Sequence, residues 1–169
     1  FVVTHTDARM LTVQIRALKL SICVTVAHAP HSEAEAANET IFWSSLEEQL
    51  SRNDDIVLLI DANGRLGSES SEAVGDQGFS QQQDENGKFF HDVMLQTGLC
   101  TPATLAPNAG PNHTWVSTHH YNRRIDYVAI PQRWLPTVTQ QYVYHDIDDL
   151  HDNEDHFPAV LTCTTTQVA

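Results

Sequence analysis

The chain has 169 residues, which is long enough for one domain with its own core and short for two. Nine Lys+Arg against 22 Asp+Glu give a net charge of −13, which argues against tight, sequence-independent binding of nucleic acid by this chain alone. No apolar run reaches the ~20 residues that cross a bilayer, so we expect no membrane span.

The first residues, from Phe1 to Thr4, contain neither an initiator Met nor the regions of a signal peptide. We therefore expect the chain to begin part-way through a domain.

Strand and helix patterns alternate in the first half of the chain. Residues 9–27 predict two adjacent strands, because apolar and polar side chains alternate from Leu11 to Arg16 and a second apolar run follows. A capping box that begins at Ser32 precedes apolar residues at helical spacing, which predicts an amphipathic helix over 33–52. A strand is predicted over 55–60, and its continuous apolar run at 56–60 is typical of a strand buried on both faces.

The second half begins with a polar loop over 64–86 and then favours strands. A second helix is predicted over 87–97, with Gly98 as its C-cap. Four further strands are predicted at 114–116, 125–130, 138–143 and 159–165. Strands arranged around two helices indicate a layered α/β domain.

The cysteines Cys23, Cys100 and Cys163 are dispersed and odd in number, with no C-x-x-C pair that would indicate a zinc or redox site. Each lies in an apolar stretch, which is typical of a buried free thiol. Free thiols favour a reducing, intracellular compartment, either nuclear or cytoplasmic.

Polar groups follow apolar strands at four places, and strand ends are where α/β sheets build their sites. The four segments are Ala27-His28-Ala29-Pro30, Asp61-Ala62-Asn63-Gly64, Thr114-Trp115 with Arg124-Ile125-Asp126-Tyr127, and Asp155-His156-Phe157-Pro158. Taken singly, the first, second and fourth have an ordinary explanation: a turn histidine, an Asx turn and a chance dipeptide.

Together the segments offer acid, base and metal chemistry. His28 can move a proton or donate to a phosphate oxygen. Asp61 and Asn63 point the same way, so a carboxylate and an amide would face one site. Asp126 enters an apolar strand and must find a partner, for which a histidine is the obvious choice. The Asp155–His156 pair can combine metal contact with acid–base work.

In this order, the four segments resemble the endonuclease/exonuclease/phosphatase superfamily, and within it most of all the endonuclease domains of LINE-type retroelements. The resemblance runs from about Met10 to Cys163 and includes Asn86-Gly87 before the second helix. It implies a DNase I-like fold of the α/β (α+β) class, a two-layer β-sandwich flanked by helices. Residues 1–169 would form a single partial domain, incomplete at the N-terminus.

The resemblance also implies roles for individual residues in metal-assisted hydrolysis of a phosphodiester. The implied catalytic residues are His28, Asp61, Asn63, Asp126, Asp155 and His156. Asp61 and Asp155 would contact Mg²⁺ or Mn²⁺, and DNA is the expected substrate. The implied substrate-binding residues are Asn63, Thr114, Trp115 and Arg124.

The sequence departs from the family pattern at several points. Family domains begin with an Asn and a metal-binding Glu on early strands, and neither motif precedes Met10. Ile60 replaces the usual Gly before Asp61, and Glu154 replaces the usual Ser before Asp155.

Two hypotheses follow. The chain is part of a Mg²⁺-dependent endonuclease that residues outside it complete, and it is inactive alone. Alternatively, it is a non-catalytic, retroelement-derived module in a protein complex, with another protein covering an exposed apolar sheet.

Overall fold

The computed structural model describes residues 1–17, 20–31, 36–67, 69–77, 82–119, 121–146 and 155–164. Its main element is a six-stranded mixed sheet in the order β1-β2-β3-β4-β8-β5. These strands are β1 Val2–Thr6, β2 Met10–Ala17, β3 Leu20–His28, β4 Ile56–Asp61, β5 Leu99–Cys100 and β8 Asp126–Pro131. β3 and β4 run parallel, whereas the other neighbours in the sheet are antiparallel. The strand pair predicted within 9–27 is confirmed, and β1 was not predicted.

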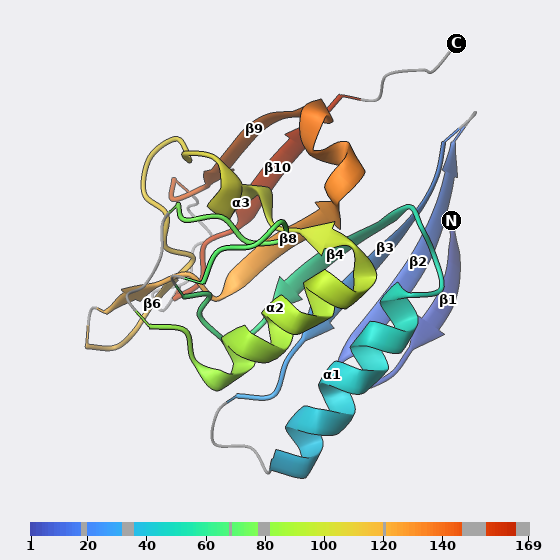
Figure 1. Ribbon diagram of the computed structural model, residues 1–169, viewed down its shortest axis with the longest axis horizontal. Coiled ribbons are helices and arrows are strands. Elements are labelled where there is room, and N and C mark those ends of the chain that lie inside the picture. The colour runs from blue at the N-terminus through green and yellow to red at the C-terminus, as the bar shows by residue number, and fades with distance from the viewer. Residues whose placement is uncertain are drawn as a thin grey trace.

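Two helices, α1 Ala36–Leu50 and α2 Glu85–Thr97, lie side by side across one face of this sheet (Figure 1). The helix predicted over 87–97 is confirmed and begins two residues earlier, because the side chain of Asp84 caps it. Gly98 ends it in the left-handed region at φ 66°, as predicted. The predicted capping box at Ser32 lies outside the described residues. None of the described helices is long and apolar enough to cross a membrane.

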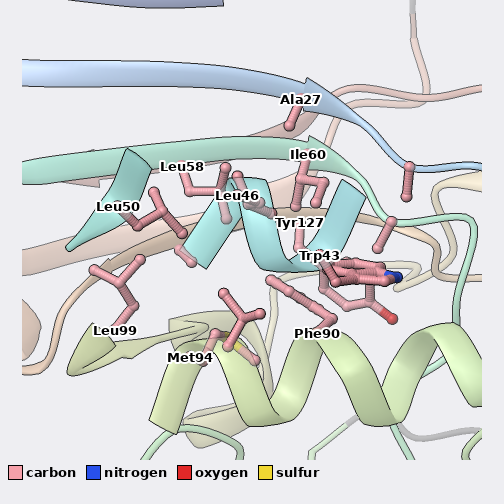
Figure 2. Packing of buried hydrophobic residues seen from close by; sticks show 14 of the residues in the cluster. Ala27, Trp43, Leu46, Leu50, Leu58, Ile60, Phe90, Met94, Leu99 and Tyr127 are labelled. Atoms are coloured by element: carbon pink, nitrogen blue, oxygen red, sulfur yellow. The ribbon is translucent and has the colours of Figure 1, made fainter. Parts of the chain in front are cut away.

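The core lies between this sheet face and the two helices. Leu46 and Leu50 of α1 and Phe90 and Met94 of α2 are at most 1% exposed, and they meet side chains such as Leu58 of β4 (Figure 2). The ring of Phe90 lies 5.1 Å from that of Tyr127 and 6.2 Å from that of Trp43. The apolar spacing within both helix patterns therefore identified the buried faces correctly.

The remaining elements lie on the β8 side of the sheet. They are α3 Pro102–Leu105, β6 Trp115–Val116, β7 Asn122–Arg123, the 3₁₀ helix Gln132–Thr137, β9 Val138–Val143 and β10 Ala159–Cys163. β9 and β10 form a two-stranded antiparallel sheet, and β10 contacts β8. β9 has the predicted bounds, whereas α3 and the 3₁₀ helix were not predicted.

The opposite face of the main sheet is apolar and open to solvent along β2, β3 and β4. Leu11, Ile15, Leu20, Val26 and Leu59 on this face are 37% to 45% exposed. The prediction that the 55–60 strand is buried on both faces is therefore wrong, because no described segment packs over this side of β4. The expectation of an exposed apolar sheet is confirmed for the described residues. We call this surface the open face.

Candidate active site

Three neighbouring strands bring polar side chains to one end of the main sheet. Parallel pairing of β3 with β4 sets His28 opposite Asp61, and antiparallel pairing of β4 with β8 sets Asp61 opposite Asp126. Paired residues point to the same face of a sheet. The strand registers therefore align the three side chains in a row.

His156 joins this row from the segment that leads into β10. Its Nδ1 lies 3.0 Å from Asp126 Oδ2. His156 is therefore the histidine partner that the sequence predicts for the Asp126 carboxylate. A β-bridge with Trp115 holds the main chain of His156 in place. Asp61, Asp126 and His156 each bring one ligand atom to a common point, with these atoms within 4.8 Å of one another. His28 adds a second imidazole, with Nε2 3.5 Å from Asp61 Oδ2.

The cluster lies at one end of an open hollow of about 680 Å³. Val26, Leu59 and Val128 form an apolar wall of this hollow and belong to the open face. The polar cluster and the open face therefore form one continuous surface. A layer that covers Val26, Leu59 and Val128 would therefore lie directly beside the cluster.

Nearby charges and burial shift the pKa values of Asp61 and His156. Burial raises the pKa of Asp61, and the nearby carboxylate of Asp126 raises it further. The hydrogen bond to Asp126 raises the pKa of His156 above its ordinary value of 6.5, although partial burial opposes this. Since three carboxylates act on His156, the cluster stabilises a positive charge at this point.

The Asp126–His156 pair makes a prediction about pH. We expect Asp126→Asn to lower the pKa of His156, because the hydrogen bond to a carboxylate is its largest cause. The raised pKa means that the pair stabilises the fold fully below pH about 6.5 and that this contribution is lost as pH rises through the folded pKa. The free energy of unfolding of Asp126→Asn should therefore fall less than that of the wild type as the pH rises from about 6.5 through the folded pKa of His156. NMR titration of the histidine ring protons measures the shift, with exposed His119 as an internal control.

Asp61 and Asn63 adopt an Asx turn and still serve the cluster. Asp61 Oδ1 accepts from the Asn63 amide at 2.9 Å, while Oδ2 lies towards His28. Asn63 has φ 43°, a left-handed conformation that Asn tolerates better than most residues. Its side-chain Nδ2 donates to the Ala29 carbonyl at 2.9 Å, so the turn also ties the segment after β4 to the segment after β3. The structure therefore shows the Asx turn, and the roles of Asp61 and Asn63 in catalysis stay predictions.

The other residues singled out in the sequence lie around the cluster. Asp155 is exposed, and its carboxylate accepts from the Trp115 indole at 3.2 Å, outside the group formed by Asp61, Asp126 and His156. Thr114 is fully buried, and its hydroxyl accepts from the amides of Ile125 and Asp126. Thr114 therefore offers no surface to a substrate and instead fixes the start of β8.

Arg124 is half-buried, and its guanidinium donates to the side chain and main chain of Asn112. A basic group that the sequence did not single out lies at the same end of the sheet. Arg9 is exposed, and its guanidinium donates to the His28 carbonyl at 3.2 Å. The register of the β2–β3 pair would have placed Arg9 there, because Met10 lies opposite Ala27.

The side chains in the cluster fit a divalent cation. Asp61 and Asp126 offer carboxylate oxygens, the ligands that Mg²⁺ and Mn²⁺ prefer. The imidazole of His156 suits Mn²⁺ better than Mg²⁺ as a direct ligand, and suits either as a nearby proton carrier. Among the described His, Cys, Asp and Glu residues, this is the one group of three with such geometry.

No protein-family model and no curated protein sequence matches the chain. Solved structures do match. The 3′ phosphatase NExo from Neisseria, bound to a product DNA hairpin, aligns with 96% of this chain at a TM-score of 0.69 and 14% identity. The AP endonuclease LMAP from Leishmania major aligns with 94% of this chain at a TM-score of 0.67 and 17% identity. The endonuclease domain of TRAS1, a telomere-specific non-LTR retrotransposon, aligns with 94% of this chain at a TM-score of 0.62 and 16% identity.

The chain has a DNase I-like fold. The predicted fold class is thus confirmed, and the structure is also similar to an endonuclease/exonuclease/phosphatase family protein from Leptotrichia buccalis. The chain spans 67%, 56% and 65% of the lengths of the NExo, LMAP and TRAS1 chains. A retrotransposon domain and other nucleases match at similar levels, so the likeness shows the shared fold and no retroelement lineage.

Proposed function

We propose that this chain carries part of the active site of a metal-dependent phosphodiesterase that cleaves DNA as an endonuclease. The convergence of Asp61, Asp126 and His156 within 4.8 Å, from three separate parts of the sequence, supports this best. Surface carboxylates gather by chance, but an Asp–His hydrogen bond beside a half-buried carboxylate with a raised pKa is typical of a reaction centre. We further propose a LINE-type retroelement ancestry, on the sequence motifs alone.

The side chains divide the work of hydrolysis. A divalent cation at Asp61 and Asp126 would polarise a phosphoryl oxygen and acidify a bound water. His156, oriented by Asp126 through Nδ1, can take or give a proton at Nε2. His28 lies on the other side of Asp61 and can donate to a phosphate oxygen. Arg9 supplies positive charge at the same end of the sheet.

The open face indicates that the reaction centre needs a further layer. Catalysis of this kind depends on donors held in a site from which water is excluded. Here the hollow beside the cluster opens onto solvent along the apolar wall of Val26, Leu59 and Val128. We propose that a further β-layer, supplied by the same polypeptide or a partner, covers this wall and adds ligands for the cation. The chain alone would then be inactive.

Plasmid nicking tests this function. The chain is assayed alone and together with a candidate β-layer, with Mg²⁺, with Mn²⁺ and with EDTA. We expect nicking only in the completed form, only with a divalent cation, and not in His156→Ala. A completed form that binds DNA but never nicks it, or nicking that persists in EDTA, would contradict the proposal.

The open face and the net charge of −13 also favour a second candidate function, a non-catalytic module within a protein complex. An exposed apolar sheet of this extent marks an interaction surface, and the acidic total weakens attraction to DNA. In this case Val26→Glu and Leu59→Glu on the open face should abolish the complex. His156→Ala should leave both the complex and the protein's biological role intact. Loss of that role in His156→Ala would exclude the purely structural function.

A further inference from the structure

Asn86, at the first turn of α2, is one of the buried polar side chains among the described residues, at 3% exposure. A buried amide is costly unless its donors and acceptor are hydrogen-bonded. All of the polar atoms of this side chain have partners. Nδ2 donates to the carbonyls of Pro30 at 2.8 Å and Asn63 at 3.2 Å, and Oδ1 accepts from the indole of Trp43 at 3.1 Å.

The three partners come from three different segments. Pro30 follows β3 and lies two residues after His28, while Asn63 follows β4 and lies two residues after Asp61. Trp43 belongs to α1 and packs with Phe90 in the core (Figure 2). One amide therefore connects both site-bearing segments to a rigid aromatic group of the core.

Glycines allow the segment after β4 to approach α2 this closely. A Cβ on Gly64 would lie 2.6 Å from the Asn86 Cβ, and a Cβ on Gly87 would lie 1.9 Å from the Arg65 carbonyl oxygen. The helix cap adds a second connection, because Asp84 accepts from the amides of both Arg65 and Gly87. The N-terminus of α2 is thus docked against the segment that carries Asp61 and Asn63.

We infer that Asn86 is a positioning residue for the reaction centre, which sets the spacing between His28 and Asp61 by holding the segments that follow them. Asn63 closes the same connection from the other side, because its Nδ2 donates to Ala29. The two amides together tie residues 29–30 to residue 63 at three points. The effect on cleavage rests on the proposed function, whereas the effect on the two segments does not.

The test compares Asn86→Ala with Met94→Ala. Met94 lies on the same helix about two turns beyond Asn86 and is fully buried. Amide hydrogen exchange of the wild-type chain and both variants is read at Ala29 and Asn63, whose N–H groups donate to Asp61. We expect Asn86→Ala to speed exchange at these two amides by about 10-fold or more, beyond its effect on the core strands. Met94→Ala should lower protection evenly.

Trp43→Phe provides a second variant if Asn86→Ala does not fold. It keeps an aromatic ring in the core and removes the N–H donor to Asn86, so exchange at Ala29 and Asn63 should rise severalfold. In the completed enzyme, Asn86→Ala should lower kcat about 100-fold, the loss typical of a small misplacement, and change KM little.

The inference would be overturned if Asn86→Ala speeds exchange evenly over the core strands, Ala29 and Asn63, as Met94→Ala does. Asn86 would then add only to overall stability. Unchanged exchange at Ala29 and Asn63 in Trp43→Phe would overturn it as well. Absence of cleavage in the wild-type completed form would count against the proposed function alone, because the exchange measurement still decides the role of Asn86.

Discussion

Asp61→Asn should lower the rate of Mg²⁺-dependent nicking by about 1,000-fold, the loss typical of removing one group that stabilises the transition-state charge. The same variant should be as stable as the wild-type chain or more stable. Burial raises the pKa of Asp61, which means that the folded structure disfavours its charge. The amide of Asn has the same shape, can accept from the Asn63 N–H, and carries no charge to bury.

A lower nicking rate together with unchanged or higher stability separates an effect on catalysis from an effect on folding. Nicking of supercoiled plasmid by the completed form measures the rate, and thermal unfolding of the chain measures stability. Asp55→Asn is the matched control, because Asp55 lies just before the other end of β4 and binds Arg133 at the surface. It should leave nicking unchanged. An Asp61→Asn protein that is both active and less stable would show that this carboxylate is structural.

The largest expected loss of stability is in the core. Phe90→Ala should lower the free energy of unfolding by about 3 to 5 kcal/mol, because a fully buried aromatic ring is replaced by a cavity. The ring contacts those of Trp43 and Tyr127, so the cavity would open between α1, α2 and β8. A domain of this size is stable by only about 5–15 kcal/mol, so much of its stability would be lost.

Phe89→Ala gives the comparison for the neighbouring residue. Phe89 is only partly buried and packs at the edge of the hydrophobic core against Trp43, with ring centroids 6.3 Å apart. Its loss should cost clearly less than that of Phe90. Urea unfolding followed by tryptophan fluorescence measures both variants. Equal losses in the two variants would mean that the packing in Figure 2 is not the packing of the folded protein.

The sequence predicted the regular elements well where local patterns decide them. The apolar spacing of α1 and α2, the Gly98 cap and the bounds of β9 all follow from chemistry within a few residues. The predictions from sequence failed where segments far away in the chain decide whether a side chain is buried. The run at 56–60 is apolar throughout, yet Leu59 is exposed, because burial of that side depends on segments that no local pattern reveals.

The site shows the same division. The order of the motifs predicted that Asp126 would meet a histidine, and His156 is that partner. The sequence could not show that Thr114 is buried under β8 or that the guanidinium of Arg124 turns to Asn112. Those orientations depend on strand register and on hydrogen bonds between segments. Asn86 was visible only as part of a motif, and its three partners became clear in three dimensions.

Anomalous diffraction from crystals of the completed form, soaked in MnCl₂, tests most directly whether the cluster is a cation-dependent reaction centre. We predict one strong manganese peak at the end of the hollow, within about 2.0–2.3 Å of a carboxylate oxygen of Asp61 or Asp126, and its loss in Asp61→Asn. Manganese bound only at other acidic surface groups, with none beside Asp61, Asp126 and His156, would contradict the proposed function.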